Sequence, residues 1–283
     1  MNRRRFLVAS ATAAGLSATA PLTAGAVVDR IRKQVAVPWR EQTVDTFKAG
    51  GPNTPVTGIA TTFMATFDVL QRAASAGKNF VITHEPTFYN HEDQTADFAG
   101  DPVYAAKAAF IEKNRMAIFR FHDHWHARRP DGIMAGVIAS LGWEKYRSPE
   151  GRGFTLPPTT LEALAADLRG KLQIKTIRVI GDPRLPVKNV AYGPGFNSLQ
   201  GAMRTLARPE TDALVIGESR EWETIEYAQD AIAAGQKKGL IILGHAISEE
   251  PGMKECASWL KTFISEVPIE FVPAGEPFWT PKT

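Results

Sequence analysis

Five of the six histidines in this chain follow short apolar runs that are typical of buried strands. In open α/β sheets, ligands bind beyond the carboxyl ends of the strands. Imidazole together with carboxylate is the ligand set that zinc, iron, manganese and nickel prefer. The sequence therefore predicts a metal site, and we interpret the protein as a metalloenzyme. The runs are residues 80–83 before His84, 117–121 before His122, His124 and His126, and 240–244 before His245.

The first of these sites is a pair of adjacent residues, His84 and Glu85. Adjacent side chains diverge in an extended strand. The pair therefore suits two bridged metals, or one metal and a group that handles protons. The alternative is a hydrogen-bonded loop histidine beside a surface carboxylate.

The second site is the triple cluster of His122, His124 and His126. All three share a face if the chain is extended, whereas only His122 and His126 share one in a helical turn. His122 and His126 stay together in both cases, so we prefer them as metal ligands. His124 or Asp123 would then orient an imidazole. A solvated polar loop is the alternative.

The third site combines His245 with Glu249 four residues later. Ser248 is expected to cap the following helix, with Glu249, Glu250 and Pro251 in its first turn. Glu249 or Glu250 could instead serve only to stabilise that helix start.

Two further segments suggest no chemistry. Residues 192–197 lack dinucleotide and phosphate-loop spacings and are typical of a tight turn. Residues 91–93 are typical of a polar loop.

Alternating strand and helix signals place these sites in a largely parallel sheet with right-handed crossovers. Thr66 is expected to cap the first helix and Gly77 to end it. From 144 to 160 the residues are typical of turns and a linker, after which a second lobe begins. Expected strands are 56–62, 80–83, 117–121, 176–180, 187–192, 211–217 (with Glu218 at its end), 240–244 and 269–272; expected helices are 66–77, 103–111, 132–141, 160–170, 221–234 and 253–263.

The N-terminal 26 residues predict an export signal. Residues 2–7 match a twin-arginine signature, a mild apolar stretch follows, and Ala24-Gly25-Ala26 forms a small-residue cleavage site. The stretch is too short and too polar for a membrane-spanning helix, and Pro21 interrupts it. We therefore expect a periplasmic or secreted protein.

The rest of the chain is electrically neutral. The formal charge of +3 comes from 33 basic and 30 acidic residues, and residues 3–5 supply all of it. The sequence pI of about 8.9 thus gives no support for nucleic-acid binding or anionic-membrane binding. The single cysteine, Cys256, excludes an internal disulfide and reads as a small core residue.

Taken together, the three blocks resemble a known family over residues 56–272. These are the dinuclear-metal-centre hexameric proteins called Nif-three-like, also described as GTP cyclohydrolase type 2. Residues 80–88 are similar to the family's apolar strand followed by His-His-Pro. Residues 122–126 with the helix to 142 are similar to its His-x-x-x-Asp block. Residues 244–249 are similar to its Gly-His-x-x-Ser/Thr-Glu block, and 212–218 to the strand before it.

The resemblance implies a set of six metal ligands and two departures from the family pattern. Glu85 stands where the family has a second histidine, and His126 stands where it has an aspartate that commonly bridges the metals. Relative to the family pattern, one carboxylate is thus relocated from position 126 to position 85. Our hypothesis is that Glu85 takes over the bridging or charge-balancing role. The implied ligands are His84, Glu85, His122, His126, His245 and Glu249.

The resemblance also implies an α/β fold of two interlocked lobes with mainly parallel mixed sheets, a metal site at the strand ends in the cleft, and a hexameric ring. We expect a signal at 1–26, a metal-binding lobe at 27–150, a second lobe at 151–210, and a return segment at 211–283 that completes the metal site.

The function expected from these features is a metal-dependent hydrolase acting on a small molecule. Two divalent ions, of zinc, iron, manganese or nickel, would activate a water, and Glu85, Glu218 or Glu250 would shuttle a proton. The alternatives are a non-catalytic metal-binding or assembly protein, and a single-metal phosphoesterase built on the His122 cluster.

Overall fold

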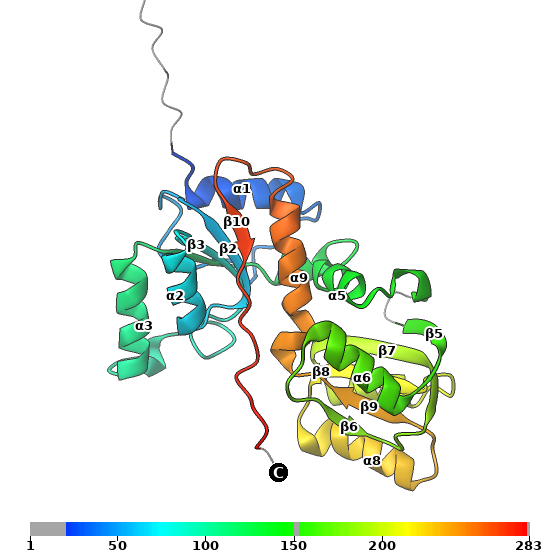
Figure 1. Ribbon diagram of the computed structural model, residues 1–283. Helices are drawn as coiled ribbons and strands as arrows, with labels where there is room; N and C mark the ends of the chain where they lie inside the picture. The colour runs from blue at the N-terminus through cyan, green and yellow to red at the C-terminus, as the bar shows by residue number, and fades with distance from the viewer. Residues whose placement is uncertain (1–20, 150–152, 282–283) are drawn as a thin grey trace, which may run out of the picture.

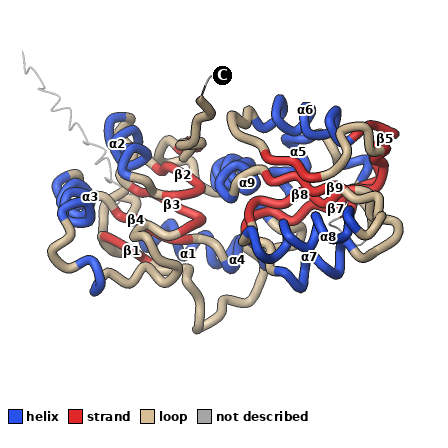
Figure 2. The backbone as a smooth tube through the Cα atoms, turned by 90° about the horizontal axis from the view of Figure 1, so that it is seen from below, coloured by secondary structure: helices blue, strands red, loops and turns tan. Residues whose placement is uncertain are grey.

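The computed structural model describes residues 21–149 and 153–281, so most of the expected export signal lies outside the described residues. Two five-stranded mixed sheets form two lobes side by side (Figures 1 and 2). Both sheets have helices on both faces, which is the expected α/β architecture. Among the described residues, no helix is long and apolar enough to cross a membrane.

The first sheet has the strand order β1-β4-β3-β2-β10, and every neighbouring pair is parallel except β1 with β4. Helices α2 and α3 cover one face, and α1 lies on the other. Because both faces are covered, the central strands are buried along nearly their whole length. The strands are β1 (Phe47–Ala49), β2 (Ile59–Met64), β3 (Phe80–Glu85), β4 (Ala117–Arg120) and β10 (Ile269–Phe271), and the helices are α1 (Ala24–Gln34), α2 (Phe67–Ser75) and α3 (Pro102–Lys113).

The second sheet has the order β5-β7-β8-β9-β6, with a parallel centre and antiparallel edges β5 and β6. Helix α6 packs on one face, and α7 and α8 pack on the other. The strands are β5 (Gly153–Thr160), β6 (Arg178–Ile180), β7 (Pro186–Phe196), β8 (Ala213–Glu218) and β9 (Gly239–Ile242), and the helices are α6 (Leu161–Leu172), α7 (Leu199–Leu206) and α8 (Glu226–Ala233).

Two helices join the lobes: α5 (Gly132–Leu141) and α9 (His245–Leu260) pack against each other between the sheets. Their backbones approach closely, because a Cβ atom on Gly136 would collide with the Pro251 carbonyl and one on Gly252 would collide with Ile133. Asp131 caps α5 through the Ile133 and Met134 amides, and Gly142 ends it in the left-handed conformation. The remaining short helices are 3₁₀ turns at Ala96–Phe98 and Glu144–Tyr146, α4 (Asp123–Ala127), and a π-type turn at Glu221–Ile225.

Three local expectations were wrong. Residues 153–160 of the expected linker from 144 to 160 form strand β5, which tolerates Pro157 and Pro158 because it is an edge strand whose register shifts between Thr155 and Thr159. Helix α9 begins at His245, so Ser248 is not its cap and Pro251 lies inside the helix. The expected helix over 221–234 starts as a π-type turn, which leaves the Trp222 side chain 71% exposed.

The second lobe ends with strand β9. Strands β8 and β9 belong to the second sheet, although we grouped their residues with the return segment. Helix α9 and strand β10 come back to the first lobe, where α9 packs on β2 and β10 pairs with β2. The return segment therefore reaches the metal site through the start of α9 and through Glu218 at the end of β8.

The expected cleavage site lies within the packed N-terminus of α1. The Thr23 hydroxyl accepts a hydrogen bond from the Ala26 amide, which caps the helix, and Ala24 is fully buried. The Gly25 amide also donates to the Pro52 carbonyl at 2.8 Å. Cleavage after Ala26 would remove these contacts.

Candidate metal centre

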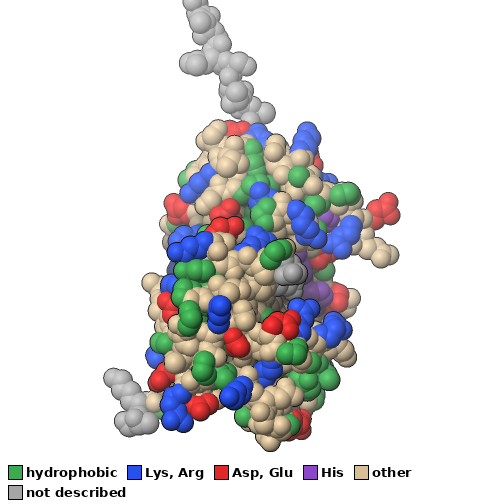
Figure 3. Space-filling view, turned by 90° about the vertical axis from the view of Figure 1, so that its right-hand side faces the viewer, with side chains coloured by type: hydrophobic (Ala, Val, Ile, Leu, Met, Phe, Trp, Pro, Cys, Tyr) green, Lys and Arg blue, Asp and Glu red, His purple; other side chains and the backbone are tan. Residues whose placement is uncertain are grey.

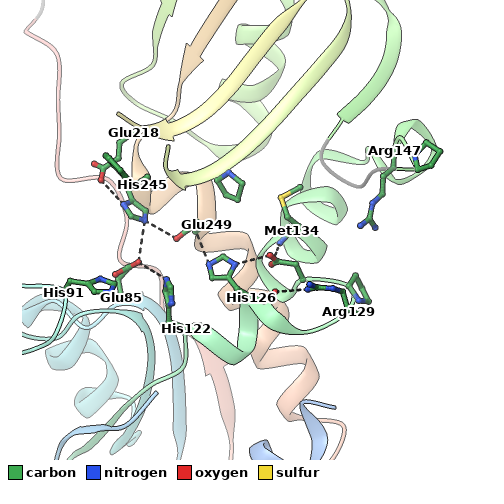
Figure 4. A pocket seen from close by; sticks show the side chains of 15 residues that line it. Glu85, His91, His122, His126, Arg129, Met134, Arg147, Glu218, His245 and Glu249 are labelled. Atoms are coloured by element: carbon green, nitrogen blue, oxygen red, sulfur yellow. Dashed lines mark hydrogen bonds and ion pairs between the residues drawn. The ribbon is translucent and has the colours of Figure 1, made fainter. Parts of the chain in front are cut away.

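Five of the six implied ligands line the opening between the two lobes (Figure 4), and the sixth, His84, is buried beside them. β3 ends at Glu85, α4 follows directly after β4, and α9 follows directly after β9, so the carboxyl ends of three strands supply the site. His84, His122 and His126 have donor atoms within 4.8 Å of one another, and so do His84, Glu85 and Glu249. These two overlapping groups could each hold a metal ion.

His245 joins the cluster from the second lobe. Its Nε2 lies 3.3 Å from Glu249 Oε2 and 3.6 Å from Glu85 Oε1. The Nε2 of His122 lies 3.6 Å from the same Glu85 oxygen. Glu85 thus lies between an imidazole from each lobe, which is the position that a bridging carboxylate requires.

All four imidazoles of the centre are held through Nδ1 and present Nε2 to the cluster. The Nδ1 partners are Phe121 O at 3.2 Å for His84, Asp123 at 2.9 Å for His122, Asp131 at 3.1 Å for His126, and Glu218 at 3.0 Å for His245. In a neutral ring, a hydrogen bond donated by Nδ1–H to its acceptor leaves the Nε2 lone pair free for a metal ion. Metal-binding histidines use this arrangement, in which the acceptor fixes the tautomer and the ring orientation.

His124 lies on the face of helix α4 opposite the two implied ligands, His122 and His126. Its imidazole is fully buried, its Nδ1 is 2.6 Å from Asp45, and its Nε2 accepts from the Arg40 amide. The Asp45 carboxylate also accepts hydrogen bonds from the backbone amides of His122, Asp123 and His124. Asp45 therefore fixes the turn that presents His122 and His126.

Glu249 occupies space that a glycine leaves open. Gly195 has a positive φ of 67°, and a Cβ atom there would collide with Glu249 Oε1 and come within 3.1 Å of His245 Nε2. Ser248 Oγ accepts the Gly195 amide at 2.9 Å. The glycine-rich segment, which we read as a simple tight turn, therefore forms a wall of the metal centre.

Burial and neighbouring charges set the protonation of the centre. Burial and the nearby His84 ring lower the pKa of His122 to about 3, so it is a neutral imidazole ready to act as a ligand. Burial opposes protonation of His245, but its hydrogen bond to Glu218 and the nearby negative charge of Glu249 outweigh it and raise its pKa to about 10. Burial also opposes ionisation of Glu249, yet His245 and His84 hold the pKa of this carboxyl well below its usual range.

Two buried atoms support a fit to a metal ion. His84 Nε2 and Glu249 Oε2 are buried, lie 3.5 Å apart and have no hydrogen-bond partner among the described residues. Unpaired buried polar atoms are costly unless a ligand satisfies them. A divalent cation would satisfy both atoms and the converging Nε2 lone pairs, so the residues present fit such an ion.

The three expected proton-handling glutamates lie in different places. Glu85 and Glu218 line the cavity, and Glu218 is bound to His245. The structure does not bring Glu250 to the cavity, because its carboxylate accepts the Gly275 amide at 2.8 Å instead. His91, which we read as part of a polar loop, also lines the cavity, and its ring packs edge-on to His122.

The cavity around the centre has a volume of about 990 Å³. Arg129 and Arg147 lie on the side away from His91 (Figure 4). Arg129 donates to the carbonyls of His126, Ala127 and Arg128 at the end of α4. Figure 3 shows histidine side chains at the surface with Lys and Arg side chains beside them. The opening is large enough for a small molecule and carries positive charge at its rim.

Sequence reasoning missed three residues that hold the ligands: Asp45, Arg120 and Asp131. Asp131 has a local signal, because Asp before Gly-Ile-Met is typical of a helix cap. Its Oδ1 caps α5 while Oδ2 holds His126. Asp45 and Arg120 have no such signal, since their partners lie 77–79 and 29–36 residues away in the chain.

Family comparison agrees with the fold and with this site. The model of the family Duf34/NIF3 (NGG1p interacting factor 3) matches residues 31–276. The chain therefore belongs to the Duf34/NIF3 family, as its three histidine blocks suggested. No curated protein matches this chain significantly.

Solved structures share the fold at low sequence identity. The hypothetical protein SA1388 of Staphylococcus aureus superposes with a TM-score of 0.71 and 18% identity, over 92% of this chain and 100% of that one. A Bacillus cereus protein related to NIF3 gives 0.72 and 14%, over 93% and 100%. Reduced HcgD from Methanocaldococcus jannaschii gives 0.60 and 15%, over 89% and 98%. These likenesses establish the two-lobed α/β fold.

Proposed function

We propose that the protein is a metal-dependent hydrolase that acts on a small molecule. The observation that carries the proposal is the convergence of four Nε2-presenting imidazoles with two carboxylates in an open cavity. A purely structural metal site is closed, whereas a catalytic site keeps access for substrate. The cavity volume of about 990 Å³ supports the catalytic alternative.

The ligand set supports one or two divalent ions held by His84, Glu85, His122, His126, His245 and Glu249. Ions bound there would supply Lewis acidity, which lowers the pKa of water and stabilises negative charge developing on a substrate. The protein's own residues orient the ligands: Glu218 fixes His245, Asp131 fixes His126, and Arg120 fixes Glu85. His91 lines the cavity outside both ligand groups, so it is the side chain we assign to proton transfer.

The test is a hydrolysis screen on the purified full chain. Metal-free protein reloaded with Zn²⁺, Mn²⁺, Fe²⁺ or Ni²⁺ is offered esters, amides, phosphoesters and cyclic imidates. We expect activity with at least one metal, and its loss in Glu249→Gln but not in Glu226→Gln, an exposed glutamate of α8. Absence of turnover with every loaded metal would favour a non-catalytic metal-binding protein.

The same screen tests the alternative of a single-metal phosphoesterase. A phosphoesterase built only on the His122 cluster would retain activity in His245→Ala. We expect this variant to be inactive, because His245 Nε2 lies within 3.6 Å of both Glu85 and Glu249.

We also propose twin-arginine export and a homo-hexameric ring. Residues 2–7 support export, and membership of the Duf34/NIF3 family motivates the ring. Cell fractionation of the tagged full chain tests export, with Arg3→Lys together with Arg4→Lys as the matched control. Light scattering on the purified protein tests the ring, and a monomeric mass would contradict it.

A further inference from the structure

A second cavity adjoins the metal centre on the side of the first lobe. It has a volume of about 540 Å³ and shares two wall residues, Glu85 and His91, with the metal cavity. A molecule in this second cavity would therefore lie next to a ligand of the centre.

Four of the ten residues that line this second cavity have apolar or aromatic side chains. Met64, Phe67, Pro86 and Tyr89 line it. The Met64 and Tyr89 side chains are 36% and 55% exposed, which is unusual for large apolar groups. An exposed apolar surface next to a reactive centre is typical of a pocket for the apolar part of a ligand.

A buried cation, Lys107, also lines this cavity. The residue is only 3% exposed, and its Nζ donates to the Thr87 carbonyl and lies 5.5 Å and 5.4 Å from the ring centroids of Phe88 and Tyr89. Two of the three ammonium hydrogens have no hydrogen-bond partner among the described residues. Lys107 can therefore donate to a ligand.

The Glu85 carboxylate that separates the two cavities is already paired with a cation. Arg120 pairs with Glu85 at 3.0 Å and lies 3.9 Å from Asp93. Glu85 is therefore occupied by Arg120, which leaves Lys107 as the cation that lines the second cavity.

We propose that this second cavity binds the substrate through an apolar, preferably aromatic, body that carries a carboxylate or another oxyanion, with Lys107 binding the anion. The proposal rests on the proposed function, because the bound group is part of the substrate of the same centre. The ring would lie against Tyr89 and Phe67, and the rest of the molecule would extend past Glu85 toward the metal centre.

Binding of benzoate to the metal-free full chain tests the proposal, with benzamide as the neutral isostere and acetate as the anion without a ring. Ligand-observed NMR and calorimetry measure the affinities. We expect benzoate to bind at least about tenfold more tightly than either control, because an ionic hydrogen bond and ring burial act together. Binding that needs added metal, or equal affinity for benzoate and benzamide, would overturn the proposal.

Two variants locate the bound benzoate. Lys107→Met should weaken benzoate about tenfold and leave benzamide unchanged, whereas Lys113→Met, an exposed lysine of the same helix, should change neither. Tyr89→Ala removes an exposed ring and should weaken both ligands, whereas Trp222→Ala in the other lobe should not. Full benzoate affinity in Tyr89→Ala would contradict the site even if Lys107→Met failed to fold. Because benzoate binding is measured without metal, its outcome does not depend on whether the protein proves to be a hydrolase.

Discussion

The guanidinium of Arg120 holds the carboxylate of Glu85 at 3.0 Å from a fully buried position. Arg120 also donates to the carbonyls of His84 and His91, so it ties the end of β3 to the loop that follows it. One oxygen of Glu85 faces this cation and the other faces His122 and His245. The arginine thus fixes the carboxylate that lies between the two lobes.

Arg120→Gln should weaken metal binding by about 10- to 100-fold, the usual effect of removing a group that orients a ligand. It should also lower the stability of the metal-free protein by about 3 kcal/mol or more, because Glu85 loses its buried partner. Competition with a chromogenic chelator measures the affinity. Arg72→Gln, in an exposed pair with Asp68, is the control. Equal affinity in Arg120→Gln and the native protein would contradict the role of this contact.

Gly195→Ala should abolish or severely weaken metal binding. The added methyl group would collide with Glu249, and the positive φ of this residue adds strain. Gly201→Ala in α7 is the control, since its Cβ would meet only Ser198 Oγ at 3.6 Å. Metal titration followed by mass spectrometry compares the two variants. Native stoichiometry in Gly195→Ala would show that this wall is not rigid.

The stability of the metal-free protein should depend on pH through His245. Its pKa is raised to about 10 in the folded state, against an ordinary value near 6.5. Protonated His245 therefore stabilises the fold fully below about pH 6.5, and this contribution is lost as the pH rises toward about 10. Urea unfolding of the native chain and of His245→Gln at several pH values isolates the effect. We expect the difference in unfolding free energy to decrease with rising pH, and a difference that grows would refute the assignment.

Processing of an exported chain should occur upstream of Thr23. Cleavage after Ala26 would delete the cap of α1 and the buried Ala24, whereas an upstream cut keeps both. Intact-mass analysis of protein recovered from the periplasm measures the new N-terminus. A mature chain that begins at Val27 would show that α1 is stable without its first turn.

The sequence predicts the site well where a local pattern carries the information. Apolar runs that end at His84 and His245 identify strands β3 and β9, because a strand covered on both faces needs an unbroken apolar run. The i, i+4 spacing of His122 and His126 predicts their shared side of the turn, and α4 confirms it. Thr66 and Gly142 act at helix ends as expected.

Long-range partners explain most of what the sequence did not reveal. Asp45 lies in an irregular segment, and only the fold brings it to the amides of α4. The proline pair in β5 is typical of a turn, and only its place at a sheet edge makes a strand possible there. Gly195 carries no motif because its role is to leave space for Glu249, which is distant in the chain.

In the proposed metal centre, imidazoles and carboxylates from both lobes hold metal together. The most direct test is the metal content of protein purified without added chelator, measured by elemental analysis and compared with that of the His84→Ala and His245→Ala variants. We predict at least one transition-metal ion per native chain and a marked loss in both variants, although they alter different lobes. A native chain that binds no metal, or variants that retain all of it, would contradict the account.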